Sequence, residues 1–177
     1  MAITKIQSES LNLSDTYDFT GTVTGAGGVN TPYFFGKSAN DQTLSRGTTT
    51  KITGLTLGEI DSDTAFDGTT FTVPSGKGGT YFIYGAVTGD AGDIGQDGEQ
   101  IRMMIYKNGV SQQLFRMMHN TSATGDIRIQ TVFGSMSLAL SAGDTIELYA
   151  ALWDFNGSGN MFTRGNETSL GGYKLID

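Results

Sequence analysis

Cysteine is missing from this chain, and histidine, tryptophan and proline are scarce, with one, one and two residues among 177. Without cysteine neither a disulfide nor a thiolate metal site can form, so we expect packing and oligomerisation to supply the stability. The single histidine, His119, has no second histidine or cysteine for a zinc site and no partners at a recognisable spacing for a catalytic triad. We therefore interpret His119 as a loop residue.

Long apolar segments are also missing. No run approaches the roughly 20 apolar residues that span a bilayer, and residues 1–6 lack the apolar core of a signal peptide. We expect a soluble protein that has no secretion signal and does not insert into a membrane. Its 11 basic residues are scattered singly against 18 acidic residues, for a net charge of -7. This disfavours a nucleic-acid partner, because phosphate binding gathers basic residues into a patch.

Glycine, by contrast, is abundant: the chain has 26 glycines without a triplet period, which indicates many tight turns rather than a collagen-like fibre. Short segments alternate in polarity and are separated by Gly, Asn, Asp and Ser, while helix signals are almost missing. Ile101, Met103 and Ile105 form one such alternation, and Asn108-Gly109 after them favours a two-residue hairpin. The pattern predicts an all-β sandwich or barrel.

The chain divides at a glycine-rich segment, residues 25–28. The sequence before it has spaced apolar residues among Ser, Asn, Thr and Asp, and the regular strand patterns come after it. We predict an N-terminal arm with a glycine hinge at residues 1–28 and a head domain at residues 29–177, because glycine restricts the backbone very little. The alternative is that the arm forms the first strands of the same domain. The apolar residues of the arm are Ile3, Ile6, Leu11, Leu13, Tyr17 and Phe19.

Several pieces of the head, in their order and spacing, resemble the C1q/TNF-like family. They are Tyr33-Phe34-Phe35, Phe66-Asp67, Phe71, Pro74, Gly79, Tyr81-Phe82, Asn108-Gly109, Leu140, Gly143-Asp144 and Gly172-Tyr173-Lys174-Leu175. The chain departs from the family where residues 75–78 lengthen the turn after the proline, and where Leu170-Gly171 replaces an aromatic residue. The resemblance implies a jelly-roll β-sandwich that assembles as a homotrimer, with the extended N-terminal arm outside it.

One long strand is expected after Asp144. Alternation gives it one apolar face, formed by Ile146, Leu148, Ala150 and Leu152, and an opposite face that carries Tyr149 and Trp153. The family resemblance implies that this strand runs near the threefold axis. We therefore predict Tyr149 and Trp153 as trimer-interface residues, since large aromatic side chains contribute much buried area. The alternative is that this face meets solvent.

The arm resembles the N-terminal segments of structural proteins in tailed bacteriophages, especially marine ones, through residues 2–6, Asn12-Leu13 and residues 19–23. This resemblance implies that Ile3, Ile6, Leu11, Leu13, Tyr17 and Phe19 attach the chain to other virion proteins. The expected location is the virion, assembled in the host bacterial cytoplasm. The expected function is a trimeric fibre or appendage head that attaches to a host-surface glycan or receptor; the alternative is a capsid decoration, cement or head-fibre protein without a receptor.

Catalysis is not expected. The chain has many carboxylates, but no context fixes two of them at a stated separation in a cleft, as glycoside hydrolysis requires. Residues 25–28 precede no predicted helix, so a phosphate-binding loop is unsupported. We predict a protein that is not an enzyme and needs no cofactor.

Two polar loops are candidate binding sites. Asp90, Asp93, Asp97 and Glu99 could supply oxygen ligands to calcium, although a solvated acidic turn is the simpler interpretation. The later loop, residues 156–169, offers Asn160, Phe162 and Arg164 for surface recognition of a hydroxyl-rich or acidic glycan. The alternative interpretation of residues 156–169 is a solvated loop with Phe162 packed into the core.

Overall fold

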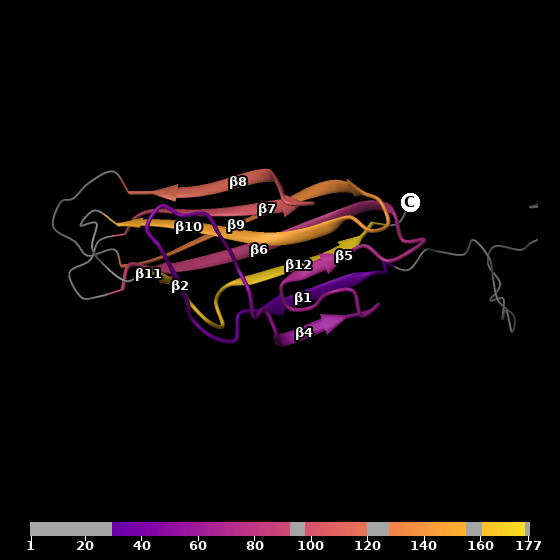
Figure 1. Cartoon of the computed structure of the whole chain (residues 1–177), viewed down its shortest axis with the longest axis horizontal. Coiled ribbons are helices and arrows are strands. Elements are labelled where there is room, and N and C mark those ends of the chain that lie inside the picture. Colours follow the sequence, from indigo (N-terminus) through magenta and orange to yellow (C-terminus); the bar gives the residue numbers. More distant parts are fainter. Residues whose placement is uncertain (1–29, 93–97, 120–127, 155–160, 176–177) are drawn as a thin grey trace, which may run out of the picture.

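The computed structural model describes residues 30–92, 98–119, 128–154 and 161–175. The predicted arm at residues 1–28, its six apolar attachment residues and the boundary of the head lie outside these ranges. Within the described residues all regular structure is β, arranged in two antiparallel sheets whose long strands run parallel to the long axis of the molecule (Figure 1). The described part of the chain contains no helix of the length and apolarity needed to span a membrane.

The larger sheet has seven strands and is organised around β6. Strand β9 pairs with β6 along its whole length, whereas β12 and β11 pair with it in succession. Outward from β12 come β1 and β4, and β2 pairs with β11. The strands are β1 (Tyr33–Lys37), β2 (Gln42–Leu44), β4 (Leu57–Asp61), β6 (Gly79–Asp90), β9 (Ile129–Leu140), β11 (Met161–Thr163) and β12 (Ser169–Lys174).

The smaller sheet has five strands, with β10 pairing β7, β3 and β5, and β7 also pairing β8. These strands are β3 (Thr50–Lys51), β5 (Thr70–Thr72), β7 (Gly98–Lys107), β8 (Val110–Met118) and β10 (Thr145–Asp154). The edges of the two sheets meet where Phe115 of β8 packs on Gly134 of β9. A Cβ atom at Gly134 would lie 2.3 Å from the Phe115 ring, so glycine is required for this approach.

The core lies between the sheets and follows from alternation along the strands. Ile146, Leu148, Ala150 and Leu152 of β10 are all buried, which confirms the apolar face predicted for this strand. The aromatic residues of the early strands join this core: Phe34 stacks on Phe71 with ring centroids 4.1 Å apart, and Tyr81 is completely buried. The Tyr81 hydroxyl donates a hydrogen bond to the carbonyl of Lys77 at 2.6 Å, so its polar atom is satisfied.

The predicted hairpin is present between β7 and β8. Asn108 and Gly109 have φ angles of 50° and 75°, the left-handed conformation that these two residue types tolerate best. The Asn108 side chain also donates to Asp144 at 2.7 Å and accepts from the Thr145 N–H at 2.8 Å. Asp144 in turn pairs with Lys107 at 2.8 Å and accepts from the Ser141 N–H at 2.7 Å. Two turns that are distant in the sequence are therefore fixed to each other.

Asp144 makes the stability of this end of the sandwich depend on pH. The hydrogen bonds from Lys107, Ser141 and Asn108 lower the pKa of Asp144 from 3.8 to about 2. A lowered carboxyl pKa stabilises the fold fully above about pH 4, and this stabilisation is lost as the pH falls through the folded pKa. Asp144→Asn should lower Tm by a few degrees at pH 7, and its difference from the unmodified chain should shrink between pH 4 and pH 2. Melting followed by circular dichroism checks this; a difference that stays constant across that range would contradict it.

Candidate assembly surface

A cluster of aromatic side chains lies on the outer side of the seven-stranded sheet. Alternation along β6 turns Tyr81 and Ile83 into the core and therefore Phe82 and Tyr84 outward. Tyr173 of β12 lies opposite Phe82, with ring centroids 5.6 Å apart, and Phe35 of β1 lies 6.3 Å from Tyr84. All four outward rings are half-buried. We call Phe35, Phe82, Tyr84 and Tyr173 the aromatic face.

Gly171 allows the rings of the aromatic face to lie close to the sheet. It is the partner of Tyr84 on β6 and of Phe35 on β1. A Cβ atom at position 171 would lie 2.6 Å from the Tyr84 hydroxyl oxygen and from a ring carbon of the same residue. Gly171 belongs to the Leu170-Gly171 pair that replaces an aromatic residue of the C1q/TNF-like pattern. It therefore leaves Tyr84 the space that an aromatic side chain would fill.

Exposed apolar residues extend the aromatic face across the same sheet. Ile60 of β4 is the partner of Phe35 and is 55% exposed, and Tyr33 is 43% exposed. Phe133 of β9, the partner of Ala86 on β6, is 79% exposed, more than any other large apolar side chain in the described residues. Exposed apolar side chains gathered on one face of a sheet are typical of interaction sites.

Before β6 ends at Asp90, whose buried carboxylate is paired with Arg128 and Arg164, the outward positions of the two longest strands of this sheet carry no charge. On β6 they are Thr80, Phe82, Tyr84, Ala86 and Thr88, and on β9 they are Thr131, Phe133, Ser135, Ser137 and Ala139. Depletion of charge together with enrichment of aromatic residues is the composition found at the centre of protein–protein interfaces.

The predicted interface residues Tyr149 and Trp153 lie on the other sheet. Both point outward from β10, Tyr149 stacked on Tyr106 at 4.0 Å and Trp153 beneath the Arg102 guanidinium at 4.3 Å. Their partners belong to the same chain, and their role in an interface stays a prediction. The aromatic face was not found from the sequence. Its only signal was that residues 81–84, Tyr-Phe-Ile-Tyr, are apolar or aromatic on both faces of one strand.

The described acidic residues that were predicted as possible calcium ligands belong to separate ion pairs. Asp90 is completely buried and pairs with Arg128 at 2.8 Å and Arg164 at 2.9 Å, so the expectation of a solvated acidic turn is wrong at this residue. Glu99 pairs with Arg46 at 3.1 Å. Asp93 and Asp97 lie outside the described residues, and within them no three His, Cys, Asp or Glu side chains come together as a metal-binding group.

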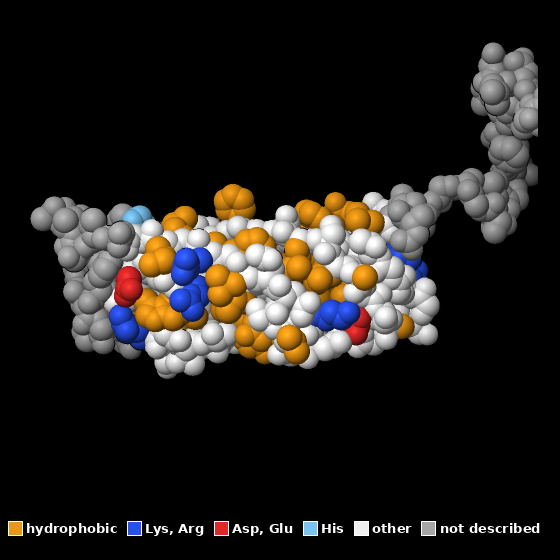
Figure 2. All heavy atoms as spheres, turned by 90° about the horizontal axis from the view of Figure 1, so that it is seen from above, with side chains coloured by type: hydrophobic (Ala, Val, Ile, Leu, Met, Phe, Trp, Pro, Cys, Tyr) orange, Lys and Arg blue, Asp and Glu red, His pale blue; other side chains and the backbone are white. Residues whose placement is uncertain are grey.

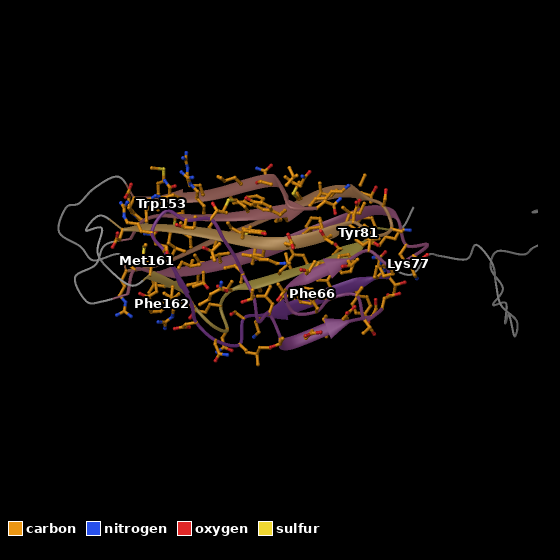
Figure 3. The ribbon with its side chains drawn as sticks, viewed as in Figure 1. Phe66, Lys77, Tyr81, Trp153, Met161 and Phe162 are labelled. Carbon is orange, nitrogen blue, oxygen red and sulfur yellow. The ribbon has the colours of Figure 1, made fainter. Side chains whose placement is uncertain are left out.

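The surface-recognition candidates fall at the same end of the sandwich, where β6, β8 and β10 finish. Arg164 is bound to Asp90, and Phe162 is half-buried on β11, where it is the partner of Asp90. Asn160 lies outside the described residues. The structure thus brings Phe162 and Arg164 together around a buried carboxylate, while recognition of a glycan by these residues stays a prediction. Phe162 and Met161 are seen near the end of the molecule where Trp153 lies, opposite to Lys77 (Figure 3).

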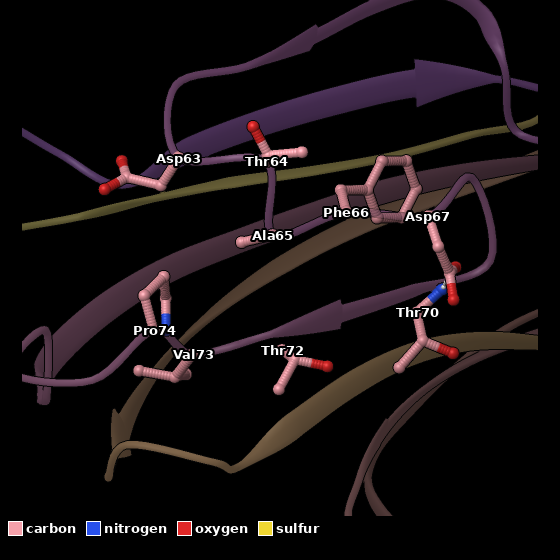
Figure 4. A pocket seen from close by; sticks show the side chains of 9 residues that line it. All are labelled: Asp63, Thr64, Ala65, Phe66, Asp67, Thr70, Thr72, Val73 and Pro74. Carbon is pink, nitrogen blue, oxygen red and sulfur yellow. Dashed lines mark hydrogen bonds between the residues drawn. The ribbon is translucent and has the colours of Figure 1, made fainter.

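A hollow of 510 Å³ lies between residues 63–67 and β5 at the other end (Figure 4). Its two carboxylates already have partners. Asp67 accepts hydrogen bonds from the N–H groups of Thr69 and Thr70 at 2.8 and 2.7 Å, and Asp63 lies 3.8 Å from the Lys77 ammonium. Figure 4 places Asp63 and Asp67 on opposite sides of the hollow.

The Asp90 cluster should be an important contributor to stability. Burial raises the pKa of the Asp90 carboxyl, but hydrogen bonds from Arg128 and the Gly92 N–H and the charges of Arg128 and Arg164 together hold it below its ordinary value. Asp90→Asn leaves two guanidinium groups without their carboxylate and should cost about 3 kcal/mol of unfolding free energy at pH 7. Arg128→Ala should cost more than Arg164→Ala, because Arg128 binds both carboxylate oxygens. Urea unfolding measures all three; an Asp90→Asn variant as stable as the parent would contradict the assignment.

No family model and no curated protein matches this sequence. Solved structures do match. The Eiger TNF of S. frugiperda superposes with a TM-score of 0.54 at 13% identity, covering 82% of this chain and 92% of that one. The globular domain of zebrafish complement 1qA gives 0.52 at 14% identity, with 82% and 98% covered, and murine APRIL gives 0.54 at 12% identity, with 81% and 98% covered. The described part of this chain therefore has the C1q/TNF-like jelly-roll fold.

Proposed function

We propose that this protein is a homotrimeric head of a bacteriophage virion, a fibre or appendage component that attaches to the host surface and does no catalysis. In this proposal three copies pack their aromatic faces around a common axis. The observation that carries it is the aromatic outer side of the seven-stranded sheet, uncharged along residues 80–88 of β6 and 131–139 of β9, with Phe133 79% exposed. Burying such a surface removes apolar area from water, at about 25 cal/mol per Å².

A closed trimer suits this surface better than an open assembly. When one face of a copy binds a different face of the next copy, the copies form a closed ring only if the rotations between them add up to a full turn. Otherwise they form a filament. Here the apolar residues extend from β4 to the edge strand β9, so each copy can cover the exposed Phe133 edge of its neighbour. The C1q/TNF-like fold supports three as the number of copies.

The positions of the chain ends support attachment. Tyr33, near the start of the described head, is the partner of Tyr173 near its end, and the Lys174 N–H donates to the carbonyl of Pro32 at 2.9 Å. At the opposite end of the molecule β6, β8 and β10 finish and β7, β9 and β11 begin (Figure 1). A head joined to the virion through residues 1–28 would therefore present this end of the sandwich to the host. Three copies would multiply weak contacts by avidity.

Phe133→Ser should weaken the trimer without unfolding the head, because the side chain is already exposed in the single chain. Gel filtration with light scattering should give a trimer for the unmodified chain and dissociation at a concentration at least about tenfold higher for the variant. Val110→Ser, a 62% exposed apolar residue on β8, is the matched control and should remain trimeric. Trp153→Ala in the same assay decides whether the other sheet takes part. If the unmodified chain is monomeric at micromolar concentration, the proposed homotrimer is wrong.

The arm is tested by deletion of residues 1–28. The shortened chain should still form trimers, because the aromatic face lies entirely within residues 33–173. It should be missing from purified phage particles, as judged by mass spectrometry of virion proteins, if the arm supplies the attachment. Normal incorporation of the shortened chain would remove the arm from that role, and an insoluble product would show that residues 1–28 belong to the sandwich. A map of the intact particle then separates a tail position from a capsid-lattice position, the second favouring a decoration protein.

A further inference from the structure

Two arginines lie directly opposite each other on the outer side of the five-stranded sheet. Arg102 of β7 and Arg116 of β8 are partners in the antiparallel register. Both point away from the core, since their neighbours Ile101 and Met103 are buried. Like charges directly opposite each other on one face of a sheet destabilise it. The placement of Arg102 opposite Arg116 therefore disfavours folding, so folding does not account for it.

Arg102 is held in a fixed position. Its guanidinium lies 4.3 Å from the centre of the Trp153 ring, and its Nε donates a hydrogen bond to Gln100 Oε1. Gly47 also lies close to Trp153: a Cβ atom at Gly47 would lie 2.9 Å from the indole nitrogen. The Trp153 ring therefore supports the Arg102 guanidinium through a cation–π contact. Arg102 is half-buried, and its partner Arg116 is exposed.

The remaining arginines of the chain differ from this pair. Arg46, Arg128 and Arg164 are each bound to a buried aspartate, Asp154 in the first case and Asp90 in the other two. Across the described ranges, neither Arg102 nor Arg116 has a carboxylate within ion-pair distance. In a chain of net charge -7 acids are abundant, but none of those in the described ranges pairs with these two arginines. An unneutralised pair of guanidinium groups is thus concentrated on one sheet face.

Apolar side chains border the pair. Leu114 and Met118 of β8, two residues to either side of Arg116, are 42% and 47% exposed. Figure 2, seen from the β8 side of the molecule, shows basic side chains next to one another and bordered by apolar ones. Guanidinium groups bind carboxylate and phosphate oxygens through paired N–H donors, and apolar borders suit the C–H surfaces of a sugar ring.

We propose that Arg102 and Arg116 form a binding site for the anionic group of a polysaccharide, a carboxylate or a phosphate repeated along the polymer. An open sheet face makes few contacts with one sugar, so the site suits a repeating polymer held by several copies at once. In this respect the inference rests on the proposed trimeric attachment role. A nucleic acid is disfavoured, because two arginines on an acidic molecule neutralise too few phosphates.

Charge reversal at Arg116 tests the site. Arg116→Glu places a carboxylate opposite Arg102, so the variant should keep or raise Tm while losing polysaccharide binding. Lys77→Glu makes the same charge change at the opposite end of the sandwich and is the control (Figure 3). Calorimetric titration of the full chain uses alginate as the carboxylate polymer, phosphomannan as the phosphate polymer, and dextran and single-stranded DNA as comparisons. We expect binding to alginate or phosphomannan that weakens with salt, falls at least about tenfold in Arg116→Glu and changes less than about twofold in Lys77→Glu.

The outcomes separate the site from the assembly. No binding to either anionic polymer, equal loss in both variants, undiminished binding by Arg116→Glu, or equal binding to DNA would each overturn the site. Light scattering on the same samples reports the oligomeric state. A trimer that binds neither polymer refutes the site and leaves the assembly standing, whereas Arg116-dependent binding by a monomer supports the site and refutes the assembly.

Discussion

The central strand β6 must place large side chains on both of its faces, and much of the molecule follows from that requirement. Tyr81 and Ile83 fill the core, while Phe82 and Tyr84 fill the outer side of the same sheet. The neighbouring strand β12 adapts to both sides: Gly172 lies opposite Ile83 and Gly171 opposite Tyr84. A Cβ atom at either glycine would lie 2.6 Å from the side chain of its β6 partner. The closing strand thus carries glycine at two adjacent positions because its partners on the central strand, Ile83 and Tyr84, are large.

The local features of the fold could be predicted from the sequence because they depend on neighbouring residues. The alternation of Ile146, Leu148, Ala150 and Leu152 identified a strand and its core face, and Asn108-Gly109 identified a hairpin. The aromatic face escaped prediction for a local reason too. Where every residue of a segment is large and apolar, alternation has no contrast, and the outward side chains cannot be told from the inward ones.

Long-range pairing was the part that the sequence could not supply. Asp90 looked like a solvated acidic residue because its partners Arg128 and Arg164 are 38 and 74 positions away. Arg164 looked available for recognition for the same reason. The sheet topology decides these contacts by placing β9 and β11 on either side of the end of β6. Tyr149 and Trp153 were correctly placed on an outward face, but the sequence did not reveal which sheet would carry the larger unpartnered surface.

The end of the sandwich where Pro32 meets Lys174 lies far from the end where β6, β8 and β10 finish, and this has a mechanical consequence (Figure 1). The long strands β6, β7, β9 and β10 run from one end of the molecule to the other (Figure 1). Antiparallel hydrogen bonds lie perpendicular to their strands. A pull applied between the two ends therefore loads many bonds of each ladder together, in shear, instead of opening them one after another. A head built this way resists tension along its own axis better than tension across it.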